Sequence, residues 1–155
     1  MTLLEDTRQQ ENKHDFKLQY FEEQNIKVDR CGLYVGDYTI ANNQSVCVDT
    51  KKDLIEICNN VCKDHERFRK EMIRAMDAEI KLYILCENGN GIKNIEDVKN
   101  WVNPRLKRNP KAMTGEQLYK IMKTQEEKYG VKYLFCDKEE TGKLILELLG
   151  VKGVA

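Results

Sequence analysis

The 155-residue sequence is poor in proline and glycine, with two and nine respectively, and it has no long apolar run. The first shortage excludes collagen-like, elastin-like and other low-complexity classes. The absence of an apolar stretch near the roughly 18 residues that a transmembrane helix needs argues against a membrane protein. Residues 1–6 are too few and too acidic for a signal peptide, so we expect a cytoplasmic protein.

An excess of either charge is also missing, because 26 basic residues balance 26 acidic ones. This balance excludes a simple basic nucleic-acid coat. It does not exclude an enzyme that acts on nucleic acid, since clustered carboxylates can offset a basic face elsewhere. Hydrophobic residues make up 41%, which is enough for a core in a chain of this length. We therefore expect one domain over residues 1–150, followed by a C-terminal tail over residues 151–155.

Six cysteines are present, but no Cys-x-x-Cys pair and no secretory signal accompany them. Cys58 and Cys62 are four positions apart on a predicted helix, and His65 follows. A zinc site built on these three would lack the fourth ligand that structural zinc sites use. Most of the other cysteines have apolar neighbours, so buried, reduced thiols are the better interpretation.

Apolar spacing predicts a chain that begins with several short strands and then alternates strands with helices. The segment 80–86 is an almost continuous apolar run, typical of a central strand covered on both faces. We expect an α/β fold in which helices flank both faces of a mixed sheet. The predicted strands are residues 2–5, 26–30, 37–41, 46–51, 80–86 and 131–136, and the predicted helices are 13–24, 53–61, 66–79, 95–101, 115–128 and 139–149.

Carboxylates at the ends of predicted strands are the candidates for chemistry. Side chains alternate along a strand, so Asp49 and Lys51 project to the same face, and Asp6 and Arg8 could do likewise. If the short strands pair, Asp37 can lie beside Asp49. Two or three carboxylates and an amine at one sheet edge suit Mg²⁺ or Mn²⁺ and hydrolysis of a phosphodiester. Alternatively, each aspartate caps a turn or is a solvated strand-end residue.

Several motifs in order resemble the XPF-type nuclease domain of the PD-(D/E)xK superfamily, which has a restriction-endonuclease-like fold. Residues 3–9 resemble the opening strand and its D-x-R-E motif, and residues 35–38 match the G-D-Y motif. Residues 46–54 stand where the family has E-R-K, and residues 65–69 and 80–87 resemble the next helix and strand. The resemblance implies metal-dependent cleavage of branched or flap DNA.

The resemblance also implies roles for individual residues. Asp37 and Asp49 would be metal ligands, and Asp6 would complete or support the acidic cluster. Lys51 would be the catalytic lysine, and Arg8 would hold the scissile phosphate or a carboxylate. Two departures stand out: Asp49-Thr50-Lys51 replaces E-R-K with a shorter acid and no arginine, and D-x-R-E ends in a glutamine.

Contacts to DNA are expected from basic residues outside this cluster. The stretch 103–113 contains both prolines and four basic residues but no acid, so it is suited to backbone phosphates. A second basic patch lies on the helix around residue 67. The alternatives are a solvated loop and a charged outer helix face. The candidate DNA contacts are Arg67, Arg69, Arg105, Lys107, Arg108 and Lys111.

The family resemblance implies further features of the whole protein. Its nuclease domains often pair, so a homodimer is expected. Small stand-alone forms are familiar from phages and mobile elements, which implies a bacterial or phage-infected cell, association with the nucleoid and a role in DNA repair or recombination. Two other functions stay open. One is a catalytically degenerate DNA-binding or scaffold protein on the same fold, and the other is a protein-interaction factor that targets a host enzyme.

Overall fold

A six-stranded mixed sheet forms the centre of the computed structural model, which describes residues 1–9, 15–87 and 91–153. The strand order is β2-β1-β3-β4-β5-β6. Strand β1 is parallel to β2 and antiparallel to β3, β3 is antiparallel to β4, and β4, β5 and β6 are mutually parallel. The strands are β1 (Thr2–Asp6), β2 (Lys27–Cys31), β3 (Tyr38–Ile40), β4 (Asn43–Lys51), β5 (Lys81–Cys86) and β6 (Lys132–Phe135).

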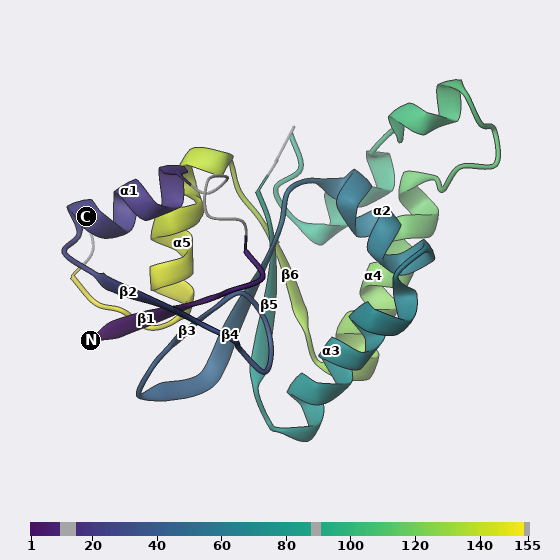
Figure 1. Ribbon diagram of the computed structural model, residues 1–155. Helices are drawn as coiled ribbons and strands as arrows, with labels where there is room; N and C mark the ends of the chain where they lie inside the picture. The colour runs from purple at the N-terminus through teal and green to yellow at the C-terminus, as the bar shows by residue number, and fades with distance from the viewer. Residues whose placement is uncertain (10–14, 88–90, 154–155) are drawn as a thin grey trace.

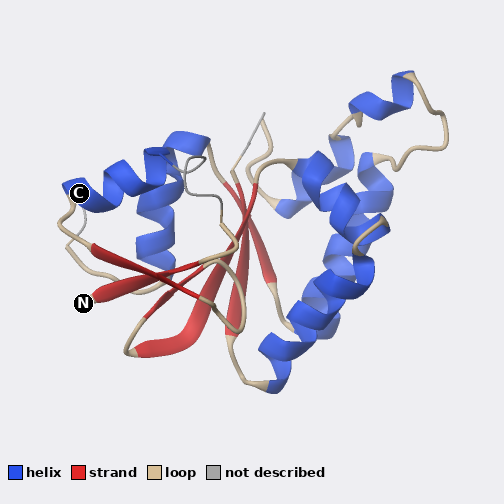
Figure 2. Ribbon diagram, viewed as in Figure 1, coloured by secondary structure: helices blue, strands red, loops and turns tan. Residues whose placement is uncertain are grey.

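Helices cover both faces of the sheet, as predicted, and Figures 1 and 2 show the two layers on either side of it. One layer contains α1 and α5, and the other contains α2, α3 and α4. The α-helices are α1 (Asp15–Glu23), α2 (Leu54–Cys62), α3 (His65–Asp77), α4 (Gly115–Tyr129) and α5 (Thr141–Leu148). In the described part of the chain, three short 3-10 helices complete the fold: η1 (Ile95–Asn100), η2 (Pro104–Lys107) and η3 (Lys138–Glu140).

Two hydrophobic clusters hold these layers to the sheet. The first includes Ile57, Met72 and Ile84 and lies under α2, α3 and α4. The second includes Tyr38 and Leu146 and lies under α1 and α5. Alternation along the strands assigns successive residues to opposite clusters, because neighbouring side chains in a strand point to opposite faces.

Several boundaries differ from the sequence prediction for local physical reasons. The predicted helix 95–101 is the 3-10 helix η1, a short turn capped by Asn94 and ended by the extended backbone of Trp101. The predicted helix 139–149 is divided into η3 and α5. The predicted tail begins with a packed residue, since Val151 is 7% exposed and belongs to the second cluster. Residues 13 and 14, at the predicted start of the first helix, lie outside the described residues.

The segment between η1 and α4 projects from the layer of α2 and α4 (Figure 1). It contains η2 and is anchored at one point to α2, where Arg105 Nη1 donates a hydrogen bond of 2.8 Å to Asn59 Oδ1. Among the described residues, no helix combines the length and apolar character that a membrane span requires.

Candidate active site

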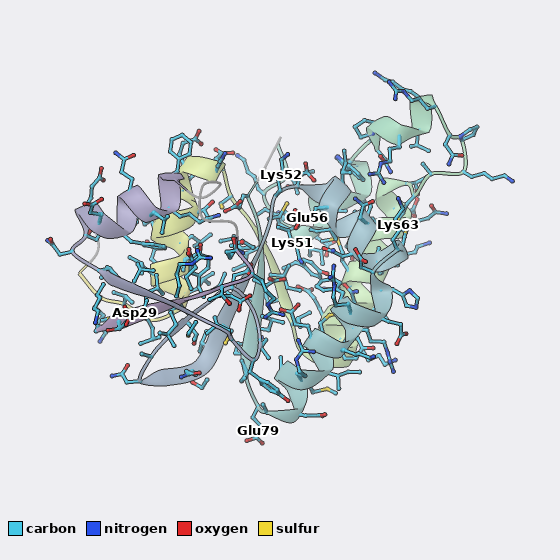
Figure 3. All side chains as sticks on the ribbon, viewed as in Figure 1. Asp29, Lys51, Lys52, Glu56, Lys63 and Glu79 are labelled. Atoms are coloured by element: carbon cyan, nitrogen blue, oxygen red, sulfur yellow. The ribbon has the colours of Figure 1, made fainter. Side chains whose placement is uncertain are left out.

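The end of β4 carries a buried aspartate and a buried lysine on the same face. Asp49 is 5% exposed and Lys51 8%, and Lys51 Nζ lies 3.1 Å from Asp49 Oδ2. The ammonium also lies 4.8 Å from the centroid of the Phe68 ring on α3. Figure 3 shows Lys51 between the sheet and the helices α2 and α3. The two side chains thus lie on the same face, as the alternation rule predicted.

Burial alone would lower the pKa of Lys51, but the neighbouring carboxylates, with Asp49 first, outweigh burial and raise it. The lysine is consequently a permanent cation at neutral pH.

Asp37 is brought beside Asp49 by the short loop that joins β2 to β3. Its backbone N–H donates to Val48 O at 2.8 Å, and its Oδ2 accepts from the backbone N–H of Thr50 at 2.8 Å and from the Thr50 hydroxyl at 3.0 Å. Gly36 permits this approach because its φ is +73° and an added Cβ would lie 3.1 Å from Val48 O. Glycine at position 36 is thus required by the geometry of the turn.

The pKa of the Asp37 carboxyl is raised well above its ordinary value, first by burial and then by the negative charge of Asp49. Two carboxyl groups share a confined space here, and ionising both is unfavourable without a compensating cation.

Glu71 on α3 is a third carboxylate at this site, and the sequence analysis did not single it out. Its Oε1 accepts a hydrogen bond of 3.0 Å from the backbone N–H of Gly36. Burial, followed by repulsion from Asp49, raises its pKa to about 7, although Lys51 acts in the opposite direction. A signal was present in the sequence, since position 71 falls within the stripe formed by Phe68, Met72 and Ala75, the buried residues of α3.

Asp6 lies at the same end of the sheet, but both of its carboxylate oxygens already accept hydrogen bonds from the protein. Its Oδ2 accepts from Arg8 Nε at 2.6 Å, and its Oδ1 accepts from the backbone N–H of Leu33 at 2.9 Å. Its own N–H donates to Asp37 O at 2.8 Å. These contacts make Asp6 an anchor for the loop that carries Asp37, while 66% of the Arg8 side chain stays exposed.

Gln9, which replaces the glutamate of the family motif, lies at the edge of this cluster. Its amide nitrogen is 3.4 Å from the Thr50 hydroxyl, which donates to Asp37. The glutamine therefore extends the hydrogen-bond chain that orients Asp37 without adding a negative charge.

A divalent cation fits the pair of Asp37 and Asp49 better than it fits a larger cluster. In the described ranges 1–9, 15–87 and 91–153, no three His, Cys, Asp or Glu side chains are grouped closely enough to hold a metal. Mg²⁺ is often bound through only one or two carboxylates, with water as its remaining ligands. Asp49 Oδ2 is buried without a hydrogen bond, although Lys51 is near, and oxygen donors are what Mg²⁺ and Mn²⁺ prefer.

The predicted DNA contacts are all on the surface, in two separate places. Arg67 and Arg69 are exposed on α3, and Arg67 pairs with Asp64 at 3.6 Å. The other four are exposed in the projecting segment, on η2 and in the loop that follows it: Arg105, Lys107, Arg108 and Lys111.

The cysteines are distributed between interior and surface. Cys47 and Cys86 are buried, as expected from their apolar neighbours, whereas Cys136 is only partly buried. Cys58 is also buried, Cys62 is exposed, and none of the six forms a disulfide. Burial raises the pKa of the Cys58 thiol to about 11, so it stays protonated. His65 makes a 3.3 Å contact with Glu66, and His14 lies outside the described residues.

Comparisons with known proteins bear on the family and the fold. A family described as the ERCC4 domain matches residues 6–148. The solved structure of XPF from Aeropyrum pernix superimposes on this chain with a TM-score of 0.67 at 18% sequence identity. The match covers 96% of this chain and 63% of the XPF chain. The same protein in complex with DNA gives a TM-score of 0.66 at 17% identity, with 96% and 62% covered.

This chain thus spans less than two thirds of the length of those two structures. A comparison with curated protein sequences gives no significant match. The structural likeness confirms the predicted nuclease-type fold, and the family match confirms the resemblance first seen in the motifs. The chain therefore belongs to the ERCC4 domain family.

Proposed function

We propose that this protein is a divalent-metal-dependent endonuclease that cleaves branched or otherwise structured DNA. The observation that carries the proposal is the convergence of Asp37, Asp49 and Lys51 at one end of the sheet, two carboxylates and a fixed cation. Asp37 and Asp49 would hold Mg²⁺ or Mn²⁺, which would polarise the scissile phosphodiester and make bound water more acidic.

The protein side chains supply charge and orientation around that centre. Lys51, whose pKa is raised, offers an ammonium that stabilises negative charge developing on the phosphate in the transition state. Thr50 holds one oxygen of Asp37 through two hydrogen bonds, which orients the carboxylate. Arg8 is exposed beside Asp6 and can bind a phosphate of the substrate at the rim.

The raised pKa values support a cationic partner for the site. Asp37 and Glu71 lie close to Asp49, and the carboxyl groups of Asp37 and Glu71 both have a raised pKa even though Lys51 supplies one positive charge to the site. A metal ion must compete with these protons, so its affinity should rise with pH until the carboxyl groups are ionised.

DNA as the substrate is supported by the family and by the surface. One similar structure is XPF from Aeropyrum pernix in complex with DNA. The exposed basic residues of the segment after η1 and of α3 can neutralise backbone phosphates. A preference for branched or flap DNA, a homodimer, and a role in a bacterial or phage-infected cell stay predictions.

A cleavage assay tests the proposal directly. Labelled flap, fork, four-way junction and linear duplex DNA are incubated with Mg²⁺, Mn²⁺ or EDTA, using wild type, Asp37→Ala and the matched surface variant Asp29→Ala. We expect cutting that requires metal, prefers a branched substrate, is lost in Asp37→Ala and persists in Asp29→Ala. Cutting by Asp37→Ala at the wild-type rate would contradict the assignment.

A second candidate is a catalytically degenerate DNA-binding or scaffold protein on the same fold. It is favoured by the change from E-R-K to Asp49-Thr50-Lys51, which shortens a ligand. Titration with Mn²⁺ separates the two: an active site should bind one or two ions, and Asp37→Asn should abolish that binding. Junction binding that survives EDTA, with no Mn²⁺ binding and no cleavage, would favour the second candidate.

A further inference from the structure

Tyr34 is a large aromatic side chain held out to solvent close to the carboxylate pair. It is 61% exposed, which places it among the most exposed large hydrophobic residues that the structure describes. It stands three positions before Asp37 in the chain. At about 3.8 Å between successive Cα atoms, the two residues are at most about 11 Å apart. The backbone that carries the ring is therefore close to any phosphate positioned at Asp37.

The backbone that carries Tyr34 is fixed on both sides of the ring. The N–H of Leu33 donates to Asp6 at 2.9 Å, and its carbonyl accepts from Arg8 at 3.2 Å. The carbonyl of Tyr34 itself accepts from Arg74 Nε at 3.1 Å. These hydrogen bonds fasten the loop to β1 and α3, so a loosely attached loop does not explain the exposure of the ring.

Arg74 also supports the ring. Its guanidinium carbon lies 5.8 Å from the ring centroid, within the range of a cation–π interaction. Glu71, one turn earlier on α3, holds the next part of the loop through the N–H of Gly36 at 3.0 Å. One helix thus positions both the exposed ring and the turn that leads into Asp37.

A fixed, exposed aromatic ring backed by an arginine is a suitable surface for stacking a nucleobase. Every base has a π-face, so such a ring binds bases without reading sequence, but it requires a base that is not stacked in a duplex. Duplex DNA rises by about 3.4 Å per nucleotide, so the upper limit of about 11 Å between the Cα atoms of Tyr34 and Asp37 corresponds to about three nucleotide steps.

We propose that Tyr34 stacks on an unpaired base within about three nucleotides of the scissile phosphate, so that the site selects DNA with a single-stranded region there. This inference rests on the proposed function for its substrate and adds the feature of the DNA that the site would recognise. It can be tested without cleavage, because base stacking needs no turnover.

The experiment measures binding in EDTA with two DNA probes. One is a flap with 2-aminopurine at the first unpaired nucleotide, and the other is the matching continuous duplex with 2-aminopurine at the same position. We expect wild type to change the 2-aminopurine fluorescence of the flap on binding. Tyr34→Ala should raise the Kd for the flap about 5- to 150-fold and abolish the fluorescence change. The Kd for the duplex should stay within about two-fold.

Two variants control for the chemistry and for the fold. Tyr34→Phe keeps the ring and should bind the flap like wild type. Phe16→Ala removes another exposed aromatic, 52% exposed and 5.5 Å from Lys138 Nζ, and should leave both Kd values unchanged. The factor by which Tyr34→Ala raises the Kd for the flap should also be similar at 50 and 200 mM salt. Stacking, unlike a phosphate contact, releases few counterions.

Three results would overturn the inference. The first is that Tyr34→Ala binds the flap as tightly as wild type does. The second is that Tyr34→Ala loses the same factor in affinity for the flap and for the duplex. The third is a change in self-association, measured by sedimentation, that accounts for the lost binding. The proposed function fails separately, in the cleavage assay. A protein that cuts DNA while Tyr34→Ala binds flaps normally disproves the inference alone, and one that stacks bases without cutting disproves only the nuclease.

Discussion

Replacing Glu71 by glutamine should change how the stability of the protein depends on pH. Burial and the neighbouring Asp49 raise the pKa of this carboxyl from 4.5 to about 7 in the native state. Between those two pH values the native state keeps a proton that the unfolded chain releases. Stability therefore falls as pH rises through that window, because the native state binds more protons than the unfolded state.

The size of the effect follows from the same two values. At about 1.4 kcal/mol per pKa unit, the ionised carboxylate costs the native state about 3 kcal/mol above pH 7. Glu71→Gln is neutral at every pH, and its amide oxygen can still accept the hydrogen bond from Gly36. The variant and wild type should be about equally stable at pH 4.5, and the variant should be more stable by up to about 3 kcal/mol at pH 8.

The measurement is the free energy of unfolding in urea at pH 4.5, 5.5, 6.5, 7.5 and 8, with EDTA present. The control is Glu127→Gln, which replaces an exposed glutamate on α4. Its free energy of unfolding should equal that of wild type at every pH. A constant difference between Glu71→Gln and wild type across this range would refute the reasoning, since it would mean that the pKa of Glu71 is the same in the native and unfolded states.

Three further substitutions test other parts of the structure. Gly36→Ala should destabilise the protein by about 1–3 kcal/mol in thermal unfolding, because its φ is positive. Gly32→Ala, where an added Cβ meets nothing, is the control and should have little effect. Equal melting temperatures of Gly36→Ala and Gly32→Ala would contradict the prediction. Lys17→Met should cost about 3–5 kcal/mol in urea by leaving Glu87 buried and unpaired. Lys17→Met with Glu87→Leu should recover most of that loss, and a double variant as unstable as the single one would argue against the pairing. Cys62→Ser should remove the fastest-reacting thiol seen with Ellman's reagent, and an unchanged fast phase would mean that another cysteine is more accessible.

Elements with strong local signals could be predicted from the sequence. Thr114 and Gln117 form a capping box at the start of α4, and Gly130 ends that helix with a φ of 74°. These features depend on residues a few positions apart, so no tertiary contact is needed to infer them. The 3-10 helix η1 was harder, because a single short turn has the same apolar spacing as the start of an α-helix.

Part of the site could be predicted for the same reason. The alternation of side chains along β4 was enough to place Asp49 beside Lys51. Asp37 lies beside Asp49 because β3 pairs with β4, and the sequence alone could not establish that these two strands pair. Glu71 was missed because its role depends on how α3 packs against the loop before β3. The contact between Arg74 and Tyr34 was missed as well, since a hydrogen bond to a backbone carbonyl leaves no pattern in the sequence.

The second hydrophobic cluster joins the beginning of the chain to its end. Leu3 and Tyr38, in the strands that lead into Asp6 and out of Asp37, pack in the same cluster as Ile145 and Leu146 of α5. During translation, the residues of the candidate active site leave the ribosome long before α5 does. Until α5 arrives, only α1 covers that face of these strands, so the nascent chain cannot complete the site as it emerges. A premature stop before residue 141 would therefore yield a chain that contains every predicted active-site residue and still lacks the support that holds them in place.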